Sequence, residues 1–273
     1  MKTVIKPLNL DEISKKAKIS KEKASKFIDL IKRSMQPLSK RINVLENGVM
    51  RYYQVERRGI GILSTNHGKF WEYSFAIDDQ WQKYSVIVKA EIDEDLLIPV
   101  FKNQKKLVLR TDSGCETGQV FNDLTCECSD QLHLAMETIT EVGEGMIICI
   151  PTQDGRGMGL TFKLATLWIQ DVLGLNTVES AVLLAPGGII DVRTYSGVIC
   201  ILKFFGILKT CEINLATNNP KKAEVFAENG YLMSEHIPMV IEPTGNTERH
   251  LLAKQNFLGH KNLIKEGVEN ENN

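Results

Sequence analysis

The sequence lacks a long hydrophobic run. Its longest apolar stretch, around Gly197–Leu208, is interrupted by Lys203 and is too short to cross a bilayer as a helix. The first residues, Met-Lys-Thr-Val-Ile-Lys-Pro, contain no apolar segment of the kind found in secretion signals. We therefore expect a soluble, cytoplasmic protein with no membrane partner.

The chain as a whole also lacks an excess of charge of either sign. Its 273 residues carry a formal net charge of -1, which gives no argument for binding to nucleic acid or to a membrane surface. The hydrophobic content of 43% and the charged content of 25% are ordinary for a globular protein. This length suits one large domain or two smaller ones, and no internal repeat divides it.

Residues 1–45 depart from this balance, because they hold twelve Lys and Arg but only four Asp and Glu. Apolar residues recur at helical spacing between Ile13 and Ile31, which predicts one or two amphipathic helices. We expect a basic helical extension over residues 1–58 that packs on the body or on a second subunit. A small helix-turn-helix with its turn at Lys18–Ser20 is the alternative interpretation.

Strand and helix patterns alternate along the rest of the chain. Residues 60–97 resemble strands with a turn at 66–68, and a further helix pattern occupies 157–173. Short apolar strands are expected at 106–110, 146–150 and 212–216, and helices at 129–143, 197–205 and 220–229. This alternation predicts an α/β fold over residues 59–265. The polar residues 266–273 are expected to form a disordered tail.

Three of the six cysteines, Cys115, Cys126 and Cys128, lie in one short polar segment. Three thiolates can hold one zinc ion and leave its fourth position open, which is the arrangement of a catalytic zinc. Burial in a core is the alternative, but the surrounding Ser, Gly, Asn, Asp and Glu residues make a poor core segment. A disulfide does not suit the expected cytoplasmic location.

Two glycine- or asparagine-containing turns precede helix patterns and could bind an anion. Thr217-Asn-Asn-Pro-Lys-Lys222 follows a strand pattern and opens a helix, where free N–H groups attract phosphate. Asp154-Gly155-Arg156 opens another helix, and an arginine held in such a turn can clamp a phosphate or carboxylate. An ordinary capped helix with solvated lysines is the alternative for the first turn.

Asp191 and Arg193 are two residues apart, between a glycine pair and a buried helix pattern. They could form a simple surface ion pair. They could equally act as a base and an electrostatic or nucleophilic partner. The residue types alone leave both interpretations open.

Taken together, these motifs resemble the GTP cyclohydrolase II family from about Ile62 to His260. The resemblance rests on the order and spacing of several pieces, which are Arg110-x-x-Ser113-x-Cys115-x-Thr117-Gly118, Cys126-x-Cys128, Gln131, Gly155-Arg156-x-x-Gly159-Leu160, Thr177-Val178-Glu179, Asp191-x-Arg193 and Thr217–Lys222. It implies a three-layer α/β sandwich with a mixed sheet, a homodimer, and a reaction that converts GTP to a ring-opened product, formate and pyrophosphate.

The resemblance also assigns roles to individual residues. Cys115, Cys126 and Cys128 would hold one zinc ion, which activates water for attack on the purine. Arg193 would attack or stabilise the α-phosphate, with Asp191 as proton acceptor, and Mg²⁺ would neutralise the departing pyrophosphate. The nucleotide would be bound by the remaining residues of the matching motifs, which are Arg110, Ser113, Gln131, Asp154, Gly155, Arg156, Thr177, Thr217 and Lys222.

Several positions depart from the family pattern. Asp112 replaces His, Gly114 replaces Glu, Asp154 replaces Glu and Thr125 replaces Arg, while Leu167 stands where the family has a Tyr linked to the loss of formate. The segment Ser180–Pro186 also differs from the family pattern. Changed polar positions point towards changed specificity, since a site built for one base leaves unpaired groups with another.

These departures leave three functional readings open. The first is a GTP cyclohydrolase that releases formate or stops at a formamido product. The second is a paralogue that opens another ring, such as that of a uridine-type nucleotide in pyrimidine (uracil) breakdown. The third is a regulator that binds nucleotide without catalysis.

Overall fold

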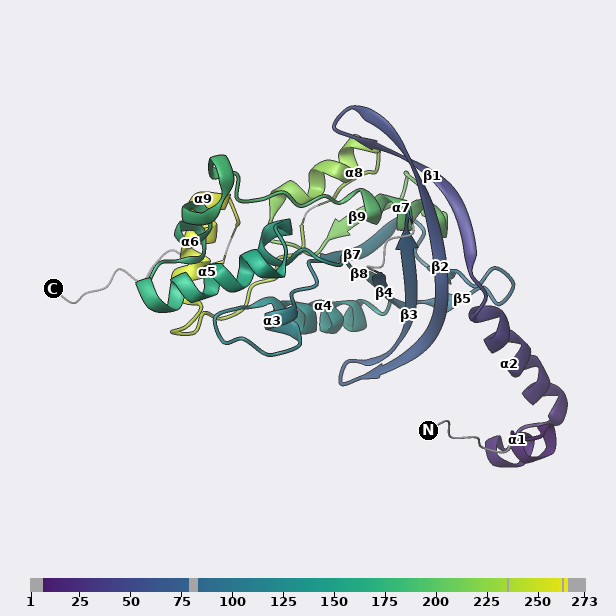
Figure 1. Cartoon of the computed structure of the whole chain (residues 1–273). Helices are drawn as coiled ribbons and strands as arrows, with labels where there is room; N and C mark the ends of the chain where they lie inside the picture. The colour runs from purple at the N-terminus through teal and green to yellow at the C-terminus, as the bar shows by residue number, and fades with distance from the viewer. Residues whose placement is uncertain (1–6, 79–82, 235, 262, 265–273) are drawn as a thin grey trace.

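The structure is a computed structural model that describes residues 7–78, 83–234, 236–261 and 263–264 (Figure 1). Its helices are α1 (Leu10–Ala17), α2 (Lys21–Ser34), α3 (Glu116–Gln119), α4 (Cys128–Val142), α5 (Leu160–Leu173), α6 (Thr177–Leu184), α7 (Ser196–Phe205), α8 (Glu224–Glu228) and α9 (Glu248–Leu258). Short 3₁₀ turns cover Asp154–Gly157, Pro186–Gly188 and Pro220–Ala223. Within the described ranges, no helix combines the length and the apolar character needed to cross a membrane.

One mixed sheet organises the chain. Its strands are β1 (Leu38–Glu46), β2 (Val49–Thr65), β3 (Gly68–Ile77), β4 (Tyr84–Lys89), β8 (Gly145–Cys149), β7 (Lys106–Asp112) and β9 (Glu212–Leu215), in that spatial order. β1 to β4 and β8 pair antiparallel, whereas β7 pairs parallel with both β8 and β9. The short strands β5 (Glu91–Ile92) and β6 (Pro99–Val100) form a separate pair.

Helices cover both faces of this sheet. On β8, Met146 and Ile148 belong to a core that includes α7, whereas Ile147 belongs to a second core with Ala135 and Ile139 of α4. Alternate strand residues point to opposite faces, so α4 and α7 lie on opposite sides of the sheet. This arrangement confirms the expected three-layer α/β sandwich with a mixed sheet.

The N-terminal extension, expected to be helical over residues 1–58, is helical only in part. Its two helices and the turn between them are present, and Asn9 and Ser20 cap their N-termini. Figure 1 shows α1 and α2 standing away from the edge of the sheet. Residues 38–58, expected to be helical, instead form β1 and most of β2. The tail expected at residues 266–273 lies outside the described residues, and the division into domains stays a prediction.

A charged residue at an inward position explains why the part of β2 before Ile60 was not recognised as a strand. Arg57 is 4% exposed, next to fully buried Val55. Its guanidinium donates to the backbone oxygens of Leu96 and Leu97 at 3.2 and 3.1 Å. A buried arginine whose guanidinium donates to carbonyls interrupts the alternation of apolar and polar residues by which a strand is recognised.

Candidate active site

A cleft lies beyond the carboxyl ends of the parallel strands. Asp112 ends β7 and leads into the cysteine segment, Cys149 ends β8 before the turn at Asp154–Gly157, and Leu215 ends β9 before Thr217. The carboxyl edge of parallel strands is where α/β folds bind ligands. Of the residues named from the sequence, the cleft is lined by Arg110, Ser113, Cys115, Cys126, Cys128, Gln131, Asp154, Gly155, Arg156, Thr177, Arg193, Thr217 and Lys222. Asp191 lines a neighbouring pocket that shares Arg193.

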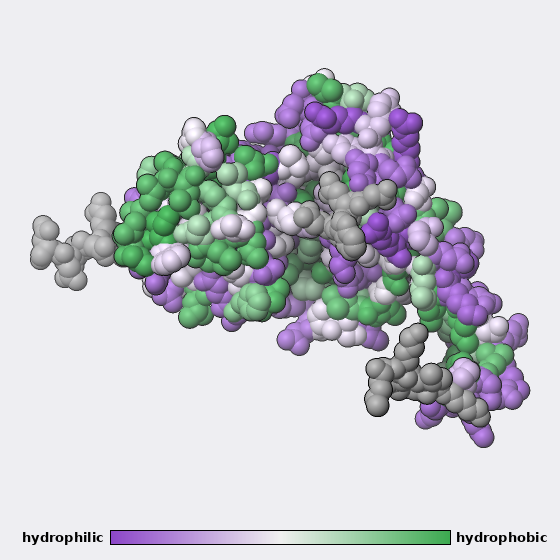
Figure 2. Space-filling model, in the orientation of Figure 1, coloured by the Kyte–Doolittle hydropathy of each residue, from purple (hydrophilic) through white to green (hydrophobic). Residues whose placement is uncertain are grey.

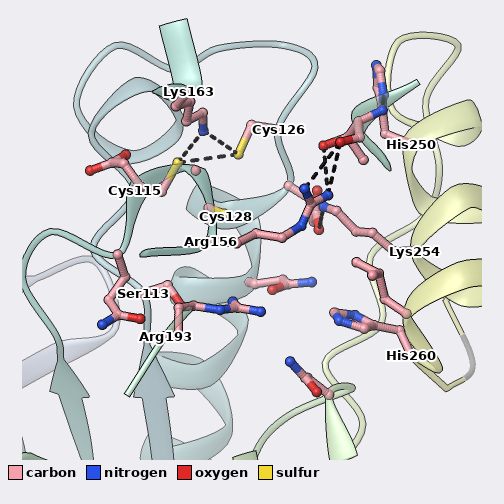
Figure 3. Close-up of a pocket in the computed structure, with 18 of the residues that line it drawn as sticks. Ser113, Cys115, Cys126, Cys128, Arg156, Lys163, Arg193, His250, Lys254 and His260 are labelled. Carbon is pink, nitrogen blue, oxygen red and sulfur yellow. Dashed lines mark hydrogen bonds and ion pairs between the residues drawn. The ribbon is translucent and has the colours of Figure 1, made fainter. Parts of the chain in front are cut away.

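The three cysteines meet at one side of the cleft (Figure 3). Their sulfurs lie within 4.8 Å of one another, and the Sγ atoms of Cys115 and Cys126 are 3.6 Å apart without a disulfide. Cys128 begins α4, and the N-cap position is held by Glu127, two residues before Ser129, the N-cap expected from the sequence. Three convergent thiolates suit zinc, because this soft donor set favours tetrahedral binding with one position left for a ligand.

Lys163 completes the surroundings of the cysteines. Its Nζ atom lies 2.8 Å from Cys115 Sγ and 3.9 Å from Cys126 Sγ (Figure 3). Burial alone would lower the pKa of Lys163, but the adjacent cysteine sulfurs outweigh it and raise that pKa. Sequence reasoning missed this residue. The available signal was that Lys163 is the one basic residue in α5, a helix whose remaining residues are mostly apolar.

Asp191 and Arg193 form a two-pronged ion pair at the wall of the cleft. Arg193 Nε donates to Asp191 Oδ1 at 2.9 Å, and Nη2 donates to Oδ2 at 2.5 Å. Burial would raise the pKa of Asp191, but the hydrogen bonds and charge of Arg193 lower it overall. With only 11% of the Arg193 side chain exposed, the pair is not a solvated surface contact. The carboxylate fixes the plane of the guanidinium.

Positive charges also line the cleft. Lys222 is 6% exposed, and its Nζ donates to the backbone oxygen of Thr111 at 2.7 Å. Burial, followed by the charges of Arg110 and Arg193, lowers the pKa of Lys222 to about 7. Lys222 is therefore not a solvated lysine, whereas Lys221 beside it is exposed. A buried cluster of three basic residues is suited to an anion.

The glycine-rich turn presents Arg156 to the cleft. Gly155 and Arg156 both have left-handed backbone conformations, with φ of 57° and 59°. The guanidinium donates to Thr177 through its backbone oxygen at 3.2 Å and its hydroxyl at 3.1 Å. Burial, and then the charge of Arg193, lowers the pKa of Arg156 to about 10. Through these hydrogen bonds, Arg156 links the turn to Thr177, the first residue of α6.

Helix α9 contributes a wall that sequence reasoning largely missed (Figure 3). His250 Nδ1 accepts from the backbone N–H of Thr177 at 3.1 Å, and burial lowers the pKa of His250 to about 4. Lys254 pairs with Glu127 Oε1 at 2.5 Å, so α9 is bound to the residue between Cys126 and Cys128. His260 also lines the cleft, and burial lowers its pKa to about 3.

Three residues that depart from the family pattern, Asp112, Gly114 and Leu167, change the surroundings of the cleft. Asp112 accepts from Arg110 at 3.0 and 3.1 Å and from Gln119 Nε2 at 2.6 Å. Gly114 has φ of 52°, and a Cβ there would lie 2.7 Å from the backbone oxygen of Ile150. Leu167 lines the cleft and offers no hydrogen bond there. The changes therefore alter the polar groups available to a bound ligand.

The fold and this cleft define an α/β protein in which a cluster of three thiols lies in the same cleft as several basic side chains. The chain belongs to the GTP cyclohydrolase II family, whose model matches residues 61–238. It is 34% identical over 198 residues to GTP cyclohydrolase-2 of Picrophilus torridus, covering 72% of this chain and 94% of the relative. Against GTP cyclohydrolase-2 of Streptomyces coelicolor it is 30% identical over 224 residues, covering 82% and 94%.

The chain is also similar to longer proteins, of which it matches a smaller share. The chain is 36% identical over 161 residues to the riboflavin biosynthesis protein RibBA of Endomicrobium trichonymphae. That match covers 59% of this chain and 38% of the relative. The chain therefore spans less than half the length of this RibBA protein.

Proposed function

We propose that the protein is a zinc-dependent nucleotide cyclohydrolase of the GTP cyclohydrolase II type. It hydrolytically opens the imidazole ring of GTP and releases pyrophosphate, with formate as a further product. The observation that carries this proposal is the placement of a three-thiol metal site and the Asp191–Arg193 pair in the walls of adjoining cavities that share Arg193. Family membership and the names of the two GTP cyclohydrolase-2 relatives support the same reaction.

Cys115, Cys126 and Cys128 hold the zinc ion in this proposal. The ion supplies activation of water at neutral pH, which is what ring hydrolysis needs. Lys163 offsets part of the negative charge of three thiolates, since its ammonium lies 2.8 Å from Cys115 Sγ. The base of the nucleotide faces this side of the cleft.

The phosphates occupy the basic side. Arg193 acts on the α-phosphate, and Asp191 holds the guanidinium in one plane so that both prongs stay aligned. Lys222 and Arg110 add charge beside it, and a Mg²⁺ ion bound with the nucleotide would add further positive charge at the phosphates. Ser113, Gln131, Asp154, Gly155, Arg156, Thr177 and Thr217 complete the nucleotide site, because they line the same cleft.

A second candidate is the opening of another nucleotide ring, such as that of a uridine-type nucleotide in uracil catabolism. It is favoured by Asp112, which engages Arg110 at 3.0 Å where the family pattern has His. Leu167 supports either a different base or a formamido product, since it removes a polar group from the cleft. A non-catalytic regulator would not need both the thiol cluster and the aligned Asp191–Arg193 pair.

The proposal includes a cytoplasmic homodimer that functions in riboflavin biosynthesis. An exposed apolar surface on α5 and α6, formed by Leu164, Trp168, Val172, Val182 and Leu183, supports the dimer. Figure 2 shows a green area over this part of the molecule. Large contiguous apolar areas on a protein surface mark association sites.

Mass spectrometry of the products tests the reaction. Zinc-loaded protein with Mg²⁺ is incubated separately with GTP, ATP, UTP and uridine monophosphate, with a chelator in parallel. A chelator-sensitive ring-opened product from GTP supports the proposal, and its mass shows whether formate has left. Turnover of another nucleotide alone selects the second candidate. Binding of a nucleotide without turnover, unchanged in Cys126→Ser, selects the regulator.

A further inference from the structure

The β1–β2 hairpin reaches the catalytic side of the molecule from outside the matched segment. β1 spans Leu38–Glu46, whereas the family model begins at residue 61. β1 lies along α7 and is bound to it at both ends. Near the C-terminal end of α7, Lys203 Nζ donates to the Asn43 oxygen at 2.6 Å, and Lys40 Nζ donates to the Phe204 oxygen at 2.8 Å.

At the N-terminal end of α7 the contact is made by a carboxylate. Glu46 Oε1 accepts from Ser196 Oγ at 2.5 Å, and its Oε2 accepts from Tyr53 Oη at 3.0 Å and Arg51 Nε at 2.9 Å. Ser196 is 5% exposed. Burial, and then the hydrogen bond to Glu46, raises the pKa of Tyr53 to about 12, so this phenol stays a donor at neutral pH. Glu46 is thus itself fixed by two donors while it holds Ser196.

Ser196 follows Arg193 by three residues. A second residue, Tyr84 of β4, also contacts this segment. A Cβ on Gly197 would lie 2.1 Å from Tyr84 Oη, so the start of α7 packs directly on that phenol. Glu46, Asp191, Arg193 and Ser196 line one pocket, and Arg193 also lines the main cleft. Glu46 therefore lies behind the wall that Arg193 presents to the cleft.

The same hairpin also holds α8, which follows the Lys222 turn. Asn229 Oδ1 accepts from the Leu45 N–H at 2.9 Å, and Asn229 Nδ2 donates to the Leu45 oxygen at 2.9 Å. The Gly48 N–H donates to Glu228 Oε1 at 2.7 Å. Both segments that carry the phosphate-directed residues are thereby fixed to β1 and its turn.

We infer that Glu46 is a positioning residue that holds the Asp191–Ser196 segment through Ser196 and so keeps Arg193 aligned with the cleft. Its effect on turnover rests on the function proposed above, but its effect on the segment does not. The hairpin then acts as a brace for the catalytic arginine. Misplacement of a catalytic group by about 1 Å can cost about 100-fold in rate, so such a brace matters for turnover.

Hydrogen exchange of the full-length protein tests the brace without any need for activity. In Glu46→Ala and in Ser196→Ala, amides of residues 192–198 exchange at least about tenfold faster, because the segment opens more often. Glu46→Gln retains slow exchange, since its amide oxygen still accepts from Ser196. Lys203→Met removes a hydrogen bond from β1 to the other end of α7, and it serves as the matched control with unchanged exchange at 192–198.

Turnover supplies the second readout. Glu46→Ala and Ser196→Ala lower kcat for pyrophosphate release at least about tenfold with little change in KM. The double variant loses no more than either single one, because both act through one hydrogen bond. Zinc content and thermal midpoint are measured alongside, and equal losses of kcat in Lys203→Met would point to a general loss of stability.

The outcomes separate the two proposals. Unchanged exchange at 192–198 in both Glu46→Ala and Ser196→Ala overturns the brace whatever the reaction is. Faster exchange with a wild type that turns over no nucleotide supports the brace and counts against the proposed reaction. Faster exchange with unchanged kcat in an active enzyme removes the positioning role.

Discussion

Gly118 packs directly against the sulfur of Cys126. A Cβ added at Gly118 would lie 2.7 Å from Cys126 Sγ and 3.3 Å from Cys115 Sγ. Among the described residues with positive φ, Gly118 does not appear, so backbone conformation does not require glycine here. The space is needed by the two sulfurs. A larger residue at position 118 must displace the sulfur of Cys126 or Cys115 from the cluster that these two cysteines form with Cys128.

Gly118→Ala is therefore expected to weaken zinc binding while the fold persists. We expect a loss in affinity of about 10- to 100-fold, the range seen when groups adjoining metal ligands are changed. Competition with a chromogenic chelator measures the affinity. Gly61→Ala is the matched control, since nothing lies within 4 Å of a Cβ there and its φ is also not positive. Wild-type affinity in Gly118→Ala would contradict the assignment of the thiol cluster as the metal site.

Gly157→Ala is expected to displace Arg193 and so to lower the rate of turnover. A Cβ on Gly157 would lie 3.0 Å from the Arg193 nitrogen and 3.2 Å from its Cγ. Gly159 provides the comparison, because it also has positive φ but has nothing within 4 Å of its Cβ position. Both variants carry backbone strain, and Gly157→Ala alone pushes on Arg193. We expect kcat for pyrophosphate release to be at least about tenfold lower in Gly157→Ala than in Gly159→Ala. Equal rates would show that Arg193 does not need its present position.

The sequence was sufficient where a local pattern marks an element or a turn. The apolar run ending at Phe205 forms α7, and the turns after β8 and β9 present Arg156 and Lys222 as expected from their motifs. Lys254 escaped because its partner Glu127 is 127 residues away and nothing near Lys254 marks it. Glu46 escaped for the same reason, since its contact with Ser196 spans 150 residues. Such contacts join residues that are far apart in the sequence, so they leave no local sequence pattern by which to predict them.

Anion binding is expected to weaken as pH rises, because of Lys222. Burial and neighbouring cations lower the pKa of Lys222 to about 7, so the unliganded protein loses this positive charge above that pH. Only the protonated form attracts an anion, and binding above the pKa must take up a proton. Sulfate affinity should thus fall by up to about tenfold per pH unit above the pKa. Calorimetric titration with sulfate, which itself does not titrate here, measures the trend.

Two lysine variants identify the titrating group. Lys222→Met should bind sulfate weakly and with little dependence on pH. Lys221→Met keeps the dependence, because Lys221 is exposed beside the same turn. A wild-type pH dependence that survives in Lys222→Met would assign the titration to another group in the cleft.

The apolar surface on α5 and α6 is expected to close a homodimer. Leu164, Trp168 and Val172 recur every four residues along α5 and are 52%, 74% and 63% exposed. Leu183 on α6 is 60% exposed. A charge placed in the middle of a buried apolar interface has no partner and opposes association. Light scattering should give a dimer for the wild type and a monomer for Leu183→Glu. Ile62→Glu, at a residue of β2 that is 62% exposed, should remain dimeric. A dimeric Leu183→Glu would place the interface elsewhere, and a monomeric wild type would remove the dimer from the proposal.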